Sequence, residues 1–158
     1  MKLHPEQYFG KWLKSKDVNL EVIDNAKRLC AAVNKLIEAM EQTGFVFKIN
    51  AFTGTIVGGE TLGGFRPQDC PIGAPKSAHK QAMAVDLFDP DNAIDHWLVS
   101  HQALLKQYGL YEPLQVCAHH QAYRSRHLQQ RAVGFEGAYD HFPQNFNRIG
   151  LLGKQAEV

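Results

Sequence analysis

The clearest pattern of hydrophobic and polar positions lies between residues 18 and 42. Apolar side chains recur there at intervals of three and four residues, as they do on one face of a helix: Val22, Ala26, Leu29, Val33, Leu36 and Met40. Asp17 or Asn19 can cap the start of this helix, and Gly44 can end it. The pattern therefore predicts a long helix with one packed face and one solvated face.

After this helix the pattern changes to extended segments. Residues 45–50 and residues 55–57 predict two strands, and the small apolar run that begins at Ala82 and continues through Phe88 predicts a third. Pairs of glycines at 58–59 and 63–64 are typical of turns. These segments favour a small sheet beside the long helix.

Two further helical segments complete the pattern. A short helical turn is predicted over residues 8–13, whose aromatic side chains can dock on the domain. A second amphipathic helix is predicted from Asp91 or Asn92 to about Tyr108, with Gly109 as its stop. Helices and strands together predict an α+β fold in a single domain that spans residues 1–158.

Composition and charge exclude several classes of function. The chain has 158 residues, of which 44% are hydrophobic and 21% charged, and its formal net charge is +1. This balance does not favour an electrostatic interface with nucleic acid or with an anionic membrane. Three cysteines, Cys30, Cys70 and Cys117, form no C-x-x-C pair and predict neither a disulfide framework nor a cysteine zinc site. Without a signal-peptide pattern or an apolar run of spanning length, we expect synthesis in the cytoplasm and no membrane insertion.

One charged residue stands inside the apolar run that predicts the third strand. The sequence AMAVDL places Asp86 among small apolar residues, and a buried carboxylate costs free energy unless a cation faces it. His79 precedes Asp86 by seven residues across a tight connection, so the two side chains can converge on one point. The two residues are therefore candidate ligands of a metal ion. A basic side chain such as Arg66 is the alternative partner of the carboxylate.

The residues around this pair resemble a known family. The run SAHKQAMAVDL (residues 77–87) is similar to the S-x-H-x-x-G-x-A-x-D signature of the zinc D-Ala-D-Ala peptidases, peptidase family M15, which share their fold with the hedgehog signalling domain. The run GFR (residues 64–66) resembles the S-G-[YF]-R element that precedes this signature. Ala82 stands where the family has a glycine. The resemblance covers about a third of the chain and implies an α+β fold of the hedgehog/DD-peptidase type, with a small antiparallel sheet and packing helices.

The resemblance also implies that His79 and Asp86 bind Zn²⁺ together with a third, downstream histidine. Four histidines are candidates: His119, His120, His127 and His141. The order of GLYE (residues 109–112) and HHQ (residues 119–121) is similar to a phage and prophage branch of the family, whose G-L-[WY]-x-E segment leads to a W-x-H-x-Q strand with the zinc histidine. This order favours His119. His120 would face the opposite side of such a strand, and His141 is the runner-up because its aromatic neighbours resemble those of the family's last ligand.

Three further residues receive roles from the resemblance. Arg66 and Ser77 would orient the peptide or stabilise the developing oxyanion. The general base departs from the family pattern, because the usual glutamate position, three residues before the last ligand, is Val116. Glu112 is the nearest carboxylate that can act as the base, and two remoter options exist, Glu136 and Asp140.

The sequence thus predicts a zinc metallopeptidase that hydrolyses peptide bonds of bacterial peptidoglycan, either as a D,D-carboxypeptidase or as an endopeptidase. The first alternative is a non-catalytic zinc-binding structural domain of a phage or prophage particle, which has kept the ligands and lost the base. The second is a domain without metal, in which Asp86 pairs with Arg66. A peptidoglycan substrate further implies carriage in a virion or release to the cell wall, while the sequence leaves the oligomeric state open.

Overall fold

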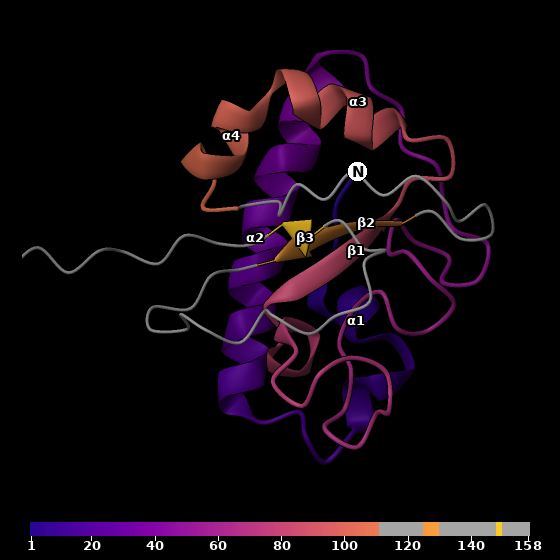
Figure 1. Ribbon diagram of the computed structural model, residues 1–158, viewed down its shortest axis with the longest axis vertical. Coiled ribbons are helices and arrows are strands. Elements are labelled where there is room, and N and C mark those ends of the chain that lie inside the picture. The colour runs from indigo at the N-terminus through magenta and orange to yellow at the C-terminus, as the bar shows by residue number, and fades with distance from the viewer. Residues whose placement is uncertain (111–124, 130–147, 150–158) are drawn as a thin grey trace, which may run out of the picture.

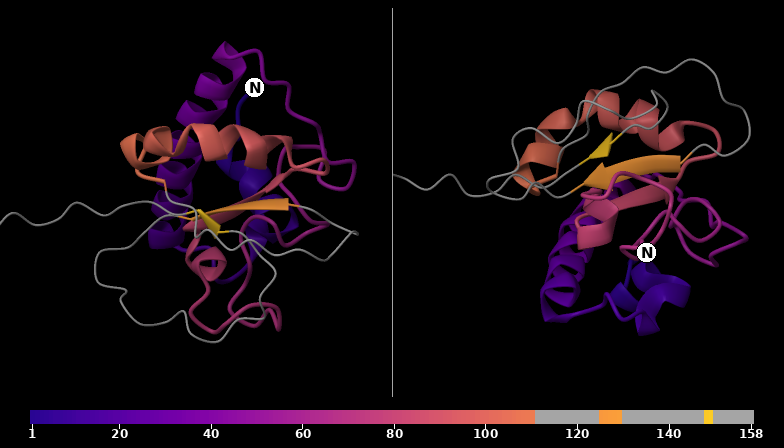
Figure 2. Two further views of the ribbon diagram at one scale, coloured as in Figure 1. Left: turned by 45° about the horizontal axis from the view of Figure 1, so that its top comes forward. Right: turned by 60° about the horizontal axis from the view of Figure 1, so that its bottom comes forward.

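The computed structural model describes residues 1–110, 125–129 and 148–149 (Figure 1). The elements in chain order are α1 (Pro5–Phe9), the 3-10 helix η1 (Gly10–Lys14), α2 (Leu20–Gln42), the 3-10 helix η2 (Ala78–Gln81), β1 (Ala84–Phe88), α3 (Ala93–Ser100), α4 (Gln102–Gln107), β2 (Ser125–Gln129) and β3 (Arg148–Ile149). Helix α2 runs along the length of this body. Helices α3 and α4 lie at one end and α1 at the other, with the strands between them (Figures 1 and 2).

The predicted long helix is confirmed as α2. It begins at Leu20, because the side chain of Asn19 accepts a hydrogen bond of 3.0 Å from the backbone N–H of Val22 and so acts as the N-cap. After its end, Gly44 takes a φ of 83°, a left-handed conformation that glycine adopts without strain. The predicted apolar face is buried over the whole length of the helix.

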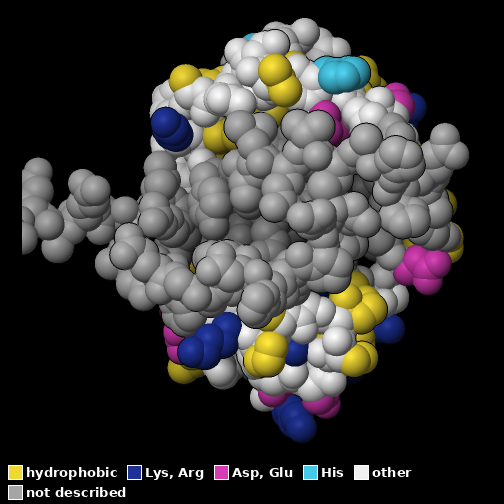
Figure 3. Space-filling model, in the orientation of Figure 1, with side chains coloured by type: hydrophobic (Ala, Val, Ile, Leu, Met, Phe, Trp, Pro, Cys, Tyr) yellow, Lys and Arg dark blue, Asp and Glu magenta, His cyan; other side chains and the backbone are white. Residues whose placement is uncertain are grey.

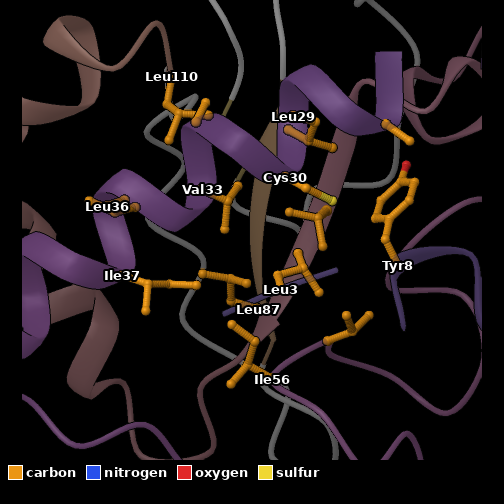
Figure 4. Close-up of a cluster of buried hydrophobic side chains, with 14 of the residues drawn as sticks. Leu3, Tyr8, Leu29, Cys30, Val33, Leu36, Ile37, Ile56, Leu87 and Leu110 are labelled. Carbon is orange, nitrogen blue, oxygen red and sulfur yellow. The ribbon is translucent and has the colours of Figure 1, made fainter. Parts of the chain in front are cut away.

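This buried face of α2 forms the main hydrophobic core (Figure 4). It packs against residues from distant parts of the chain: Leu3, Tyr8, Ile56, Leu87 and Leu110. Cys30 lies on the same face and is 3% exposed. Burial raises the pKa of its thiol to about 12, so the thiol stays protonated at neutral pH. The core therefore fixes the position of β1 relative to α2.

The sheet has the order β1-β2-β3. Strands β1 and β2 are antiparallel, and β2 and β3 are parallel, so the sheet is mixed where the sequence led us to expect an antiparallel one. The strand predicted between Ala82 and Phe88 is present as β1. The hedgehog/DD-peptidase-like architecture and the single domain over residues 1–158 stay predictions.

The two strands predicted over residues 45–50 and 55–57 do not form. The structure has only isolated bridges there, from Asn50 to Thr55 and from Val57 to Leu87. The apolar residues of segment 45–50 suggest a strand, but Val46 is 83% exposed and the described residues provide no neighbouring strand to pair with this segment. The side-chain amide of Asn50 instead donates to two carbonyls, those of Val57 and Gly59, and so stabilises the turn that follows residue 50.

The second predicted helix is interrupted, and its first backbone N–H groups bind a side chain that was not predicted. It is divided into α3 and α4 at His101, whose Nδ1 donates to the carbonyl of Trp97 at 2.7 Å and whose ring stacks on the indole. Asn92 occupies the N-cap position, as predicted, but its side chain makes no capping hydrogen bond. The buried carboxylate of Asp89 accepts from the backbone N–H groups of residues 94 and 95, at 3.0 and 3.1 Å. His96 is exposed, so within the described residues His101 has a structural position and His96 a solvated one.

Charged side chains of the described residues are visible on part of the face in Figure 3. Basic and acidic side chains are scattered over the face in Figure 3 without forming a large area of one sign. None of the helices within the described ranges is long and apolar enough to cross a membrane.

Replacing Asp89 with alanine should lower the free energy of unfolding by about 1–2 kcal/mol, because two backbone N–H groups at the start of α3 lose their acceptor. Chemical denaturation measures this change. The matched control is Asp91→Ala, since that carboxylate is exposed and its ion pair with Lys48 lies at the surface. A loss in the control as large as in Asp89→Ala would contradict the assignment of the cap.

Candidate functional site

The site is built around the segment Gly63–Arg66, whose backbone binds three other parts of the chain. The carbonyl of Gly63 accepts a hydrogen bond of 2.6 Å from the N–H of Asp86, and the N–H of Arg66 donates to the carbonyl of His79 at 3.3 Å. Between them, the N–H of Phe65 donates to the carbonyl of Tyr8 in α1 at 3.3 Å. These bonds bring β1, η2 and α1 together along one short stretch of backbone.

Such close packing requires the two glycines of this segment. A Cβ at Gly63 would overlap the carbonyl group of Gly58, and a Cβ at Gly64 would overlap the carbonyl oxygen of Tyr8. Neither glycine has a positive φ, so the requirement comes from the close approach of backbones and not from turn geometry. The sequence identified this pair as a turn, and the structure gives it the additional role of a packing contact.

His79 is held in one orientation by the backbone of this segment. It lies in η2 with 1% of its surface exposed, and its Nδ1 is 2.7 Å from the carbonyl oxygen of Gly64. A carbonyl oxygen can only accept, so Nδ1 must carry the hydrogen. In the neutral ring Nε2 then holds the lone pair, and Nε2 lies 3.6 Å from Oδ1 of Asp86. Metal-binding histidines characteristically donate their other ring N–H to a carbonyl or a carboxylate in this way.

Asp86 lies in β1, 3% exposed, and its two oxygens face different partners. Oδ1 is the oxygen near His79, and Oδ2 is 3.2 Å from Nη2 of Arg66. The guanidinium is itself fixed, because its Nε donates to the carbonyl of Leu62 at 2.6 Å. The positive charge of Arg66 offsets the cost of burying the carboxylate. The ion pair between Arg66 and Asp86, on which the predicted domain without metal depends, is therefore present.

Ser77 lies beside Arg66 at the entrance to η2 and is buried. Gly73 lies against both residues. A Cβ atom added to Gly73 would be 3.4 Å from Oγ of Ser77 and 3.4 Å from Nη1 of Arg66. The hydroxyl of Ser77 makes no capping hydrogen bond to η2, so helix capping does not account for this serine. The four predicted site residues between positions 66 and 86, Arg66, Ser77, His79 and Asp86, thus lie in one region.

The remaining predicted residues lie outside the described part of the chain. These are Glu112, His119 and their alternatives His120, Glu136, Asp140 and His141. Within the described part, no group of three or more His, Cys, Asp and Glu side chains lies close enough together to hold a metal ion. His127 is the one histidine of the four third-ligand candidates with a described backbone, and its Cα is paired with that of Asp86 between β2 and β1. Residues directly opposite in an antiparallel pair share a face of the sheet.

The described residues fit two positions of a zinc site. Histidine nitrogen and aspartate oxygen are both ordinary zinc ligands, and two ligands of a tetrahedral zinc ion lie about 3.4 Å apart. The separation of 3.6 Å between His79 Nε2 and Asp86 Oδ1 is close to that value. The donor set and the orientation of His79 are therefore compatible with zinc.

Two groups at the site were missed by the sequence reasoning. The first is the carbonyl of Gly64, which orients His79 and which a sequence pattern does not reveal because every residue has a carbonyl. The second is Lys80, which is 4% exposed although lysine is almost never buried without partners. In the sequence, only its position next to His79 indicated that Lys80 lies at the site.

Ala82, the residue that departs from the family signature, has a left-handed backbone with φ 54° and ψ 36°. This conformation costs alanine about 1 kcal/mol relative to glycine. Glycine at this position would relieve the strain, but it would also remove a fully buried methyl group worth roughly 0.8 kcal/mol. The two effects nearly cancel, so the structure tolerates alanine at the family's glycine position.

We expect Ala82→Gly to change the free energy of unfolding by less than about 1 kcal/mol, because the relief of strain offsets the lost methyl group. The matched control is Ala84→Gly, which removes a buried methyl group from β1 with no strain to relieve and should cost about 1–2 kcal/mol. Urea denaturation of both variants measures the difference. Equal losses would show that Ala82 is not strained.

Comparison of this chain with protein-family models, with curated proteins and with solved structures found no match in any of the three. The functional interpretation therefore depends on the residues of the site themselves.

Proposed function

We propose that this protein is a zinc-dependent peptidase that acts on the peptides of bacterial peptidoglycan. The observation that carries the proposal is the convergence of Arg66 and His79 on the buried carboxylate of Asp86, with Ser77 close to Arg66 across Gly73. The residues of the family-like signature lie together, and the orientation of His79 suits a ligand.

In this proposal His79 and Asp86 hold the zinc ion through Nε2 and Oδ1, and a downstream histidine provides the third ligand. Zinc bound in such a site would polarise the scissile carbonyl and activate water for attack. The carbonyl of Gly64 keeps Nδ1 of His79 protonated, so the ring stays in the tautomer that can bind metal. Asp86 can serve the metal with one oxygen while Arg66 holds the other.

The substrate side of the site would consist of Arg66 and Ser77. Two of the nitrogens of Arg66 bind Leu62 and Asp86, which leaves part of its planar set of donors to orient a carboxylate or carbonyl of the peptide. The hydroxyl of Ser77 can donate to the same group. Glu112 stays the predicted general base, which would accept a proton from the attacking water and pass it to the leaving amine.

Two histidines compete for the position of the third ligand. The resemblance to the phage branch favours His119, while the register of β1 and β2 favours His127, which is paired with Asp86. Removal of the true ligand should abolish zinc retention, whereas removal of the other should leave it intact. The zinc content of His119→Ala and His127→Ala therefore separates the two.

A second function is favoured by the ion pair between Arg66 and Asp86. Because Arg66 already compensates the buried carboxylate, the domain can be stable without metal, and a non-catalytic binding domain fits this observation. The non-catalytic zinc domain of a phage or prophage particle is the third possibility. It would bind zinc without turnover.

The place of action follows from the proposed substrate. Peptidoglycan lies outside the cytoplasmic membrane, so the proposed reaction takes place at the cell wall, and carriage in a virion or release through a membrane lesion would both bring the protein there. The proposal requires neither nucleic acid nor insertion into a membrane.

We expect His79→Ala and Asp86→Ala each to lose bound zinc, because each removes one of the ligands. His96→Ala is the control and should keep its zinc, since this histidine is exposed on α3, away from the site. Elemental analysis of the purified proteins measures the content. Full zinc occupancy in either ligand variant would exclude the proposed metal site.

The function itself is tested with the unaltered protein. We expect about one zinc ion per chain and release of peptide fragments from purified cell walls that stops when a chelator removes the metal. Zinc without release would favour the structural zinc domain. A folded protein that binds no zinc would favour the metal-free domain with its ion pair.

A further inference from the structure

The proline-rich loop of residues 67–76 connects the two predicted substrate-binding residues. It begins directly after Arg66, ends directly before Ser77, and contains no helix or strand. Several of its residues are exposed, among them Ile72, which is 52% exposed. A loop of this composition needs specific contacts to keep one conformation, because few of its backbone groups bind each other.

Lys80 provides such contacts. Its Nζ donates two hydrogen bonds of 2.9 Å, one to the carbonyl of Gln68 and one to the carbonyl of Cys70. The side-chain amide of Gln68 returns a bond of 3.2 Å to the carbonyl of Lys80. A buried ammonium group needs acceptors to compensate for lost water, and these two loop carbonyls supply them.

The backbone at Gln68 is also bound from the opposite side. Its N–H donates to the carboxylate of Asp17 at 2.9 Å, and the N–H of Cys70 donates to the carbonyl of Pro67 at 3.1 Å. The first part of the loop is therefore fixed on η2 and on the segment before α2. From this fixed part the chain continues to Gly73, which lies against both Arg66 and Ser77.

We propose that Lys80 is a positioning residue, which fastens the proline-rich loop to η2 and so keeps Gly73 against Arg66 and Ser77. It does not contact the substrate in this role. It sets the shape of the wall beside the two residues that would bind the peptide. The kinetic consequence rests on the proposed function, whereas the effect on the loop does not.

The test compares Lys80→Met with the unaltered protein. Methionine keeps much of the apolar stem and removes the ammonium group, so amide hydrogen exchange in residues 68–76 should accelerate by about tenfold or more. Lys27→Met, on the exposed face of α2, is the matched control and should leave exchange in the loop unchanged. Zinc content should stay the same in both variants. Unchanged loop exchange in folded Lys80→Met would overturn the proposal.

A measurement on the unaltered protein keeps the proposal testable if Lys80→Met does not fold. In a ¹⁵N-labelled sample, the ammonium protons of one lysine, Lys80, should exchange with water much more slowly than those of exposed lysines. Lysine ammonium protons that all exchange at the same fast rate would contradict the two hydrogen bonds to the loop.

Kinetics then connect the loop with the site. For a peptidoglycan peptide, Lys80→Met should raise KM by about tenfold with a smaller change in kcat, and Lys80→Arg should restore most of the loss because its guanidinium can reach two carbonyls. A fall in kcat alone would argue against a role in positioning the substrate side. If the unaltered protein has no peptidase activity, the proposed function fails, and the exchange experiments still decide the role of Lys80.

Discussion

The buried carboxylate of Asp86 is the constraint on which the rest of the site depends. A charge in the middle of an apolar strand is stable only if cations or donors reach it, and they must come from other parts of the chain. Here Arg66 reaches one oxygen, and His79 lies near the other. The loops on both sides of β1 must therefore fold close to the strand, and this requirement explains the short distances between their backbones.

The glycine pair at 63–64 makes that close folding possible. Without side chains, the two residues let their backbone approach Gly58 on one side and Tyr8 on the other. Tyr8 in turn donates its hydroxyl to the carbonyl of Ala84 in β1 at 3.0 Å, so α1 braces both the glycine segment and the strand. Burial raises the pKa of this phenol well above its usual value, which keeps it a donor at any physiological pH. The site is thus supported by hydrogen bonds from a helix more than fifty residues away in sequence.

The sequence predicted those parts of the structure that depend on local pattern. The periodicity of α2 and the apolar run of β1 could be read directly, and Asn19 was one of the two caps that the sequence offered. The structure places Arg66 and His79 next to Asp86, and Ser77 close to Arg66. The failures depend on partners that a sequence does not display. Residues 45–50 have the apolar character of a strand, but the described part of the chain provides no strand to pair with them, and the amide of Asn50 binds the turn that follows.

The same reason explains the helix interrupted at His101 and the buried Lys80. In both, a side chain binds backbone carbonyls whose position only the folded chain determines. The choice of the third zinc ligand shows most clearly what the sequence alone does not determine. Resemblance selects His119 by its place in the chain, whereas strand pairing selects His127 by its place opposite Asp86.

The charges of the described site bear on which kind of substrate it would take. Asp86 and Arg66 cancel each other, and His79 is neutral when Nδ1 carries its only proton. A divalent cation bound there would leave the described part of the site with a net charge of about +2, because a histidine as third ligand adds no charge. A net positive charge in a partly buried region favours an anionic substrate, such as a peptide with a free carboxylate close to the scissile bond. Among the two proposed reactions, this balance supports removal of a terminal residue over cleavage within a cross-link.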